Sequence, residues 1–106
     1  MSRLQSWFFA FTTMTMMLSP AFAKVRVPSA IVATSCQADY KKHWETDPRH
    51  QAFAVTAVGK NNSQACGGSY GFKTVEEAKA DAIRRCQREA RKYRLDKRTC
   101  HIILAR

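Results

Sequence analysis

The stretch TVEEAKADAIRRCQREARKYR, residues 74–94, decides the fold of this chain. It opens with a capping box, in which the Thr74 hydroxyl accepts a hydrogen bond from an orphan backbone N–H and Glu77 reaches back to the cap. Apolar residues then recur at steps of three and four, which places them on one side of a helix. This stripe consists of Val75, Ala78, Ala82, Ile83, Cys86, Ala90 and Tyr93. The pattern predicts a long amphipathic helix over residues 75–94 that packs on a sheet.

A hairpin is predicted on the N-terminal side of this helix. Residues 52–58 are rich in alanine and valine, residues 59–63 form a turn cluster, and residues 65–72 alternate along a second strand. The face of the second strand that carries Cys66 and Tyr70 is the one that we expect to reach a core. The opposite face is nearly bare, with only alanine, glycine and serine: Ala65, Gly67, Ser69 and Gly71.

Shorter patterns complete the fold. Residues 30–33 predict a short strand, and residues 38–45 predict two helical turns with Tyr40 and Trp44 on one side. Residues 100–104 predict a final strand with three side chains on one face: Cys100, Ile102 and Leu104. The order of elements predicts an α+β domain with a small antiparallel sheet covered on one face by the long helix.

The N-terminal residues are typical of a cleaved secretory signal peptide. Arg3 precedes an apolar run at 7–11, and the small-x-small triplet 21–23 closes the segment. The alternative is an uncleaved membrane anchor, but threonines interrupt the apolar stretch, which falls short of the roughly 20 residues needed to span a bilayer. We therefore expect a signal peptide at 1–23 and a single small domain at 24–106, exported to a periplasm or secreted.

All four cysteines lie in the expected mature domain of 83 residues. A core of that size supplies only about 3–5 kcal/mol, and an even number of cysteines in an exported chain predicts two disulfides. Zinc is the rival interpretation, but the cysteine spacings of 30, 20 and 14 residues contain no C-x-x-C pair. Cys86 and Cys100 are expected to point inward from helix and strand, so they are the favoured pair and leave Cys36 with Cys66. Three connectivities nevertheless stay open.

Charge is the strongest functional signal. Without residues 1–23 the chain has 17 basic and 8 acidic residues, and residues 84–98 alone carry a net charge of +6. Three of these arginines, Arg84, Arg88 and Arg91, share one side of the helix. The simpler interpretation is a solvated helix end whose cations interact favourably with the helix dipole. The predicted anion-binding residues are Arg84, Arg85, Arg88, Arg91, Lys92, Arg94, Lys97 and Arg98.

No catalytic residue, cofactor or metal site is predicted. Residues 67–71 match G-x-S-x-G, and Asp96 and His101 follow in the order of an α/β hydrolase. We interpret the match as accidental, because a nucleophile elbow passes directly into its helix and a domain this small cannot build the large parallel sheet. A glycine-rich strand with another element packed close to it is expected instead. No histidine has a neighbour at metal-ligand spacing: His43, His50 and His101.

Part of the chain resembles a known sequence family. The residues that carry the resemblance are His50-Gln51-Ala52-Phe53-Ala54, Gly67-Gly68-Ser69-Tyr70-Gly71-Phe72, Glu76-Glu77-Ala78 with Ala82 and Cys86, and finally Cys100. Over residues 50–105 the chain is similar to an uncharacterised domain of small exported bacterial proteins. The resemblance implies export and a paired-cysteine helix-strand end. It implies no catalytic residue, because that domain has no assigned reaction.

Two functions from different classes follow. The first is a binding module of the cell envelope or extracellular space that docks an acidic macromolecule, such as an envelope glycan, anionic lipid or nucleic acid, through residues 84–98. The second is an inhibitor or immunity-type protein that caps an acidic exported enzyme or toxin, using the bare hairpin face and the aromatic segment 40–44. Ionic strength separates them, because polyanion docking weakens steeply with salt whereas a buried aromatic anchor does not.

Overall fold

The computed structural model describes residues 26–44 and 49–106. The expected signal peptide and its cleavage site lie outside the described residues. The helices and strands follow in the order α2 (Thr34–His43), β1 (Ala52–Val55), β2 (Cys66–Ser69), α3 (Val75–Lys92) and β3 (His101–Ala105).

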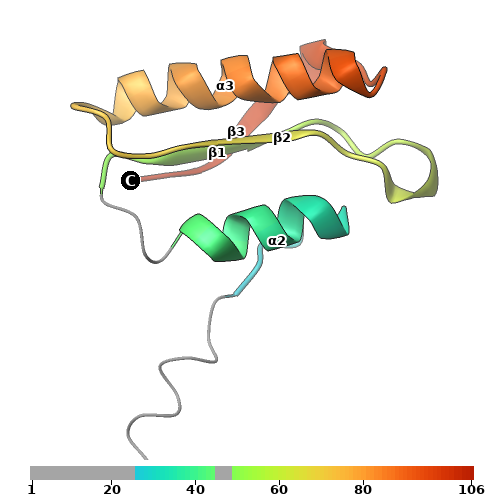
Figure 1. The fold of residues 1–106 in the computed structure, drawn as a ribbon, viewed down its shortest axis with the longest axis horizontal. Coiled ribbons are helices and arrows are strands. Elements are labelled where there is room, and N and C mark those ends of the chain that lie inside the picture. The colour runs from blue at the N-terminus through green and yellow to red at the C-terminus, as the bar shows by residue number, and fades with distance from the viewer. Residues whose placement is uncertain (1–25, 45–48) are drawn as a thin grey trace, which may run out of the picture.

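Helix, sheet and helix form three layers (Figure 1). The antiparallel sheet has the strand order β2-β1-β3, so β2 and β3 are its edges. The long helix α3 covers one face of the sheet, which confirms the predicted α+β architecture. The second face is also covered, by α2, and that layer was not predicted.

The helix α3 packs so closely on the backbone of β2 that no side chain fits between them at Gly67. A Cβ atom at Gly67 would stand 2.5 Å from the backbone nitrogen of Cys86 and 2.6 Å from the carbonyl oxygen of Ala82. On the same face, the buried Ser69 hydroxyl donates to the Ala78 carbonyl. The expectation that this face stays bare is therefore wrong, whereas the expectation of a glycine-rich strand with another element packed close to it is confirmed. This face carries small residues because α3 packs directly on it.

The face of the sheet toward α2 holds the larger side chains. Phe53 and Val55 of β1 pack there with Ile31 and Tyr40. The Tyr40 ring contacts Phe53 edge-on at 5.4 Å between centroids and stacks on Trp44 at the same distance. The predicted shared side of Tyr40 and Trp44 is thus confirmed, although the helix begins earlier than expected, at Thr34.

Residues 30–33 form no strand, contrary to the prediction. Their backbone groups bond instead mainly to two glutamine side chains: Gln37, which donates to the carbonyls of Ile31 and Val32, and the buried Gln64. The Gln64 amide oxygen accepts from the N–H groups of Val32 (2.8 Å) and Ala33 (3.2 Å), and its nitrogen donates to the carbonyls of Ala30 (2.8 Å) and Thr56 (3.1 Å). A side chain that satisfies these groups removes the need for a strand partner.

A β-bulge makes the faces of the last strand differ from the predicted pattern. Phe53 pairs with Leu104 and Ala54 with Ile102, so one residue of β3 is extra at this point. Ile102 consequently packs with Cys100 on the α3 side, whereas Leu104 packs on the α2 side. Strict alternation predicts Cys100, Ile102 and Leu104 on one face.

Two disulfides tie the layers together. Cys36–Cys66 joins α2 to β2, and Cys86–Cys100 joins α3 to the residue before β3, as the favoured pairing predicted. The disulfides indicate an oxidising, non-cytoplasmic environment. Within residues 26–44 and 49–106, no helix combines the length and apolar character needed to cross a bilayer.

Candidate functional site

The helix α3 presents its basic residues to solvent because its inner stripe is committed to the sheet. Ala78, Ala82, Cys86 and Ala90 are fully buried against the strands. The other sides of the helix must therefore carry the arginines outward. All eight predicted anion-binding residues are exposed: Arg84, Arg85, Arg88, Arg91, Lys92, Arg94, Lys97 and Arg98.

Two of these arginines are fixed by a carboxylate that is not among the predicted site residues. Asp81 is 5% exposed, and its carboxylate accepts hydrogen bonds from Arg84 and from Nε of Arg85, the latter at 2.6 Å. The spacings of three and four residues along a helix are the signal that could have identified this group. Both guanidinium groups are held in position, and both side chains stay more than half exposed, at 64% and 51%.

The turn after α3 pairs one further cation. Arg98 donates two hydrogen bonds to the Asp96 carboxylate with its side chain and a third with its backbone N–H. The Arg98 side-chain hydrogen bond, and then its backbone hydrogen bond, hold the pKa of Asp96 below its ordinary value. Lys92 lies over the Tyr93 ring at 5.5 Å from its centroid. Tyr93 is 59% exposed, so its predicted place in the buried stripe is wrong.

Five of the eight cations carry charge that no carboxylate compensates. In the part of the chain that the structure describes, these five have no carboxylate within ion-pair distance: Arg88, Arg91, Lys92, Arg94 and Lys97. They follow one another from the last turns of α3 into the short 3-10 helix Lys97–Thr99. We call the exposed basic residues of 84–98 the cationic face. It attracts anions, because unpaired like charges that lie close together repel one another until a counterion or ligand neutralises them.

Arg94 occupies a backbone position that favours glycine. The helix ends in a Schellman motif, with the Leu95 N–H donating to the Ala90 carbonyl at 2.8 Å and the Arg94 N–H donating to the Arg91 carbonyl at 3.3 Å. Arg94 itself is left-handed, with φ of 61°. The Cβ of a non-glycine residue costs about 1 kcal/mol there. The chain thus places an exposed cation at this position despite a local cost in stability.

We expect Arg94→Gly to stabilise the domain and weaken anion binding at the same time. Removing the Cβ from the left-handed position should raise the free energy of unfolding by about 0.5–1 kcal/mol. Urea unfolding and heparin affinity measure the two effects. The matched control is Arg94→Ala, which removes the same charge and keeps the strain. Arg94→Ala should lose the same heparin affinity without the gain in stability; an equal gain would show that φ of 61° is not the cause.

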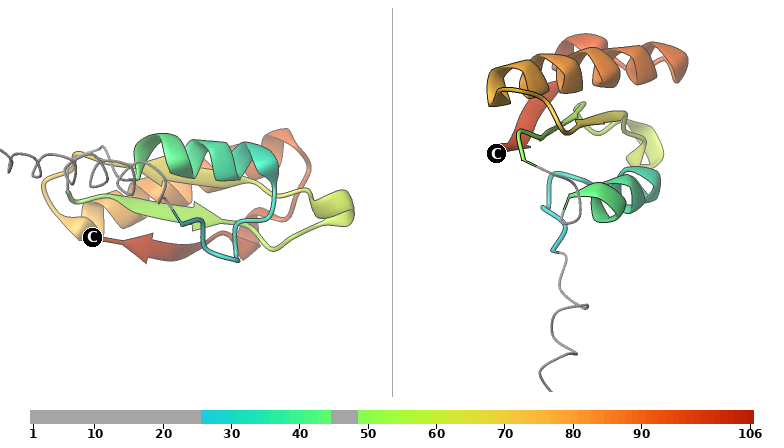
Figure 2. Two further views of the ribbon diagram at one scale, coloured as in Figure 1. Left: turned by 90° about the horizontal axis from the view of Figure 1, so that it is seen from below. Right: turned by 60° about the vertical axis from the view of Figure 1, so that its left-hand side comes forward.

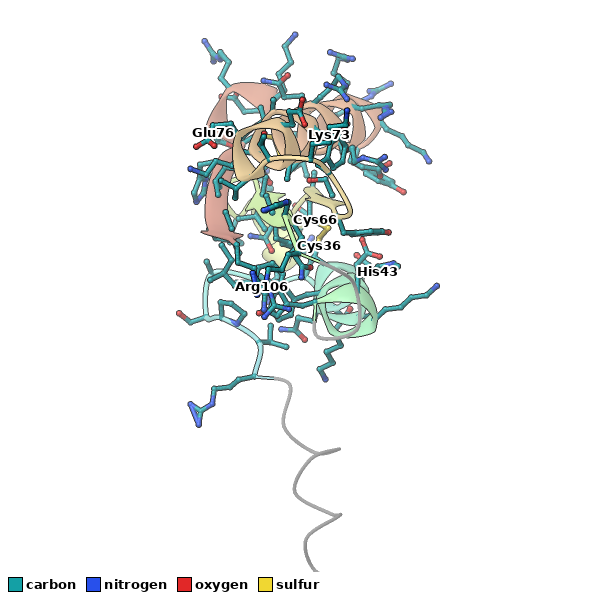
Figure 3. The ribbon with its side chains drawn as sticks, turned by 90° about the vertical axis from the view of Figure 1, so that its left-hand side faces the viewer. Cys36, His43, Cys66, Lys73, Glu76 and Arg106 are labelled. Carbon is teal, nitrogen blue, oxygen red and sulfur yellow. A yellow bond between two sulfur atoms is a disulfide. The ribbon has the colours of Figure 1, made fainter. Side chains whose placement is uncertain are left out.

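A groove of about 690 Å³ adjoins the cationic face. It lies between the two helices at the open edge of β2, with Asp39 and His43 of α2 on one wall and Arg85 and Arg88 of α3 on the other. Seen from below, α2 lies over the β2 side of the sheet and leaves β3 uncovered at the other edge (Figure 2). Viewed along the strands, His43 projects on the side opposite β3 (Figure 3). No pattern in the sequence indicates this groove, because residues 38–45 predict a shorter helix and do not place it against the sheet.

An aromatic pair lines part of the groove. The His43 and Tyr70 rings stack at 4.5 Å between centroids, and the Tyr70 hydroxyl is 3.2 Å from Nε2 of His43. Both residues contribute to the groove wall. Two parts of the surface predicted for an inhibitor are not exposed. The hairpin face is covered by α3, and Tyr40 is only 4% exposed.

The residues of the G-x-S-x-G match have other roles. Ser69 is 2% exposed and its hydroxyl donates to a helix carbonyl. Asp96 pairs with Arg98, and Nδ1 of the exposed His101 lies 2.8 Å from the Thr99 carbonyl oxygen. Ser69 is thus placed as a packing residue of the glycine-rich strand, as the sequence interpretation expected.

Comparison of the chain with protein-family models, with curated proteins and with solved structures found no match. Function is therefore inferred from the chemistry of the described residues.

Proposed function

We propose that this protein is an exported binding module that docks acidic macromolecules of the cell envelope or extracellular space through the cationic face of α3. The observation that carries the proposal is the run of five exposed cations without acidic partners, one of which, Arg94, is held at a glycine-favouring position. The resemblance of residues 50–105 to a domain of small exported proteins, and the two disulfides, support placement in a periplasm or outside the cell.

The physics of the face predicts its mode of binding. Exposed arginines on a rigid helix meet phosphate, sulfate or carboxylate groups bidentately, with little rearrangement. The affinity then comes from neutralised charge and released counterions, so it falls with salt in proportion to the number of anions contacted. Asp81 contributes by holding Arg84 and Arg85 in place before a ligand arrives. A buried apolar anchor would give no such salt dependence.

The test uses cations that no carboxylate of the described structure holds. The variant Arg88→Glu/Arg91→Glu/Lys97→Glu should weaken binding to heparin, anionic vesicles or DNA at least tenfold at low salt and flatten the salt dependence. Arg84 and Arg85 stay intact, because reversing either would place a carboxylate beside the buried Asp81.

The control for total charge changes three exposed lysines elsewhere. Lys41→Glu/Lys60→Glu/Lys73→Glu has the same net charge as the first variant and leaves the cationic face unaltered. We expect it to retain most of the affinity and the salt slope. Equal losses in the two triple variants would show that net charge alone drives binding, and would overturn the assignment of the face.

A further inference from the structure

The outer edge of β2 has the geometry of an open strand-pairing site. The Thr56 N–H donates to the Ala65 carbonyl at 3.0 Å, and Ala54 lies opposite Gly67 in the β1–β2 register. Every second residue of an antiparallel strand turns its backbone groups toward the same neighbouring strand. Because those of Ala65 face β1, those of Gly67, two residues later, also face β1. The N–H and C=O groups of Cys66 and Gly68 therefore face the open edge.

The groove encloses this edge on both sides. Arg85 and Arg88 line its α3 wall, and Asp39 lines its α2 wall. The two helices stand on opposite faces of the sheet with β2 between them (Figures 1 and 2). The space beside β2 is therefore bounded above and below, and it continues the plane of the sheet. A second copy of the chain does not suit it, because helices flank the copy's own β2 in the same way.

The two walls differ in charge. Glu89 also lines the groove, so the α3 wall carries two arginines against one glutamate, whereas the α2 wall carries Asp39 and His43. The Asp81 carboxylate holds Arg85 through Nε and leaves its terminal nitrogens without a hydrogen bond in the described residues. A strand seated here would direct alternate side chains to opposite walls. Acidic side chains match the α3 wall, and basic ones match Asp39.

We propose that this groove binds an extended segment of a partner protein, which adds to β2 as a fourth antiparallel strand and alternates acidic with basic residues. Main-chain hydrogen bonds to Cys66 and Gly68 would supply affinity, and the charged walls would set the register. This inference goes beyond docking on the cationic face, because a net-neutral segment gains nothing from a simple polyanion site.

The register fixes which peptide amides face β2. Cys66 forms its disulfide with Cys36 of α2, so its side chain points to the α2 side, and a Cβ at Gly68 would point the same way, toward Phe53. Residues that are hydrogen-bonded directly across an antiparallel pair share a face. In the bound segment, the residues that bond to β2 are therefore those directed at Asp39, which are the basic ones.

The experiment uses an acetylated, amidated (Glu-Lys)₃ peptide titrated into the full mature protein, with affinity read from backbone amide shifts. N-methylation of the lysine residues should weaken binding about tenfold, because it removes the N–H groups that face β2. N-methylation of the glutamates should change it less than about twofold. The Gly68 amide should shift and gain protection from hydrogen exchange.

Further arms separate the alternatives. The isomer Glu₃-Lys₃ has the same composition without alternation and should bind weakly. Arg88→Glu should reduce peptide affinity several-fold, while Lys41→Glu, on the exposed side of α2 outside the groove, should not.

Sensitivity to methylation of the glutamates alone would support addition in the parallel orientation. Equal tolerance of both methylated peptides, no binding of (Glu-Lys)₃, or a dimer of the protein by sedimentation would overturn the proposal. Heparin binding, measured in parallel, reports separately on the cationic face.

Discussion

Replacing Gly67 with alanine should cost about 3 kcal/mol of the free energy of unfolding, because the new Cβ would overlap the backbone of α3. The new Cβ would lie 2.5 Å from the Cys86 nitrogen, 2.6 Å from the Ala82 oxygen and 2.7 Å from the Arg85 Cβ. Backbone atoms at such distances cannot rotate away, as the end of a flexible side chain could. The helix is also held at this point by the disulfide between Cys86 and Cys100. Urea unfolding measures the effect as a lower midpoint.

The neighbouring glycine is the matched control. A Cβ at Gly68 would meet only the Phe53 ring, at 3.2 and 3.3 Å, and a ring edge can move by a few tenths of an ångström. Alanine also restricts the unfolded chain more than glycine does, which offsets part of the contact. Gly68→Ala should therefore stay within about 1 kcal/mol of the native protein. If the two substitutions cost the same, close packing of α3 on β2 is not the reason for the glycines.

The sequence carries the local part of this fold well. The Thr74 hydroxyl accepts from the Glu77 N–H at 3.1 Å, which confirms the threonine half of the predicted capping box. The stripe of alanines with Cys86 determines which side of α3 is buried, and that geometry led to the correct cysteine pairs. These features depend on residues within a few turns of each other, so local spacing is enough to predict them.

The errors arise where distant residues decide the structure. Gln64 bonds to backbone groups 31 to 34 residues away, which no periodic pattern in residues 30–33 could indicate. The bulge in β3 depends on its pairing with β1 and reverses the face of Leu104. The bare strand face was misjudged for a related reason, because small residues mark both an empty face and a tightly packed one.

The candidate site shows the same division. The basic run could be predicted from the sequence, because α3 fixes the direction of its side chains. Its internal pairing with Asp81, the left-handed backbone of Arg94 and the groove beside β2 required the structure. The groove in particular depends on α2, whose position is set by the Cys36–Cys66 disulfide and by the contact of Tyr40 with Phe53.

Removing the Cys36–Cys66 disulfide should have the second large effect. Its loop spans 30 residues, for which the chain-entropy estimate gives between about 3 and 4 kcal/mol. The Cys36→Ala/Cys66→Ala variant should also free α2 from the edge of the sheet, since this bond is the covalent link between them. Urea unfolding and hydrogen exchange of the α2 amides measure both consequences. Alanine is used at Cys36 because that site is 1% exposed and a serine hydroxyl would be buried there.

The functional consequence distinguishes the two binding surfaces. The cationic face lies on α3 and the turn that follows it, so the variant should retain heparin affinity under conditions in which it stays folded. The groove loses one wall when α2 detaches, and affinity for the (Glu-Lys)₃ peptide should fall about tenfold as main-chain pairing loses its enclosure. Cys86→Ala/Cys100→Ala is the matched control, because it removes a disulfide of similar strength and leaves α2 attached to β2. Peptide binding that survives loss of Cys36–Cys66, but not loss of Cys86–Cys100, would mean that α3 alone forms the peptide site.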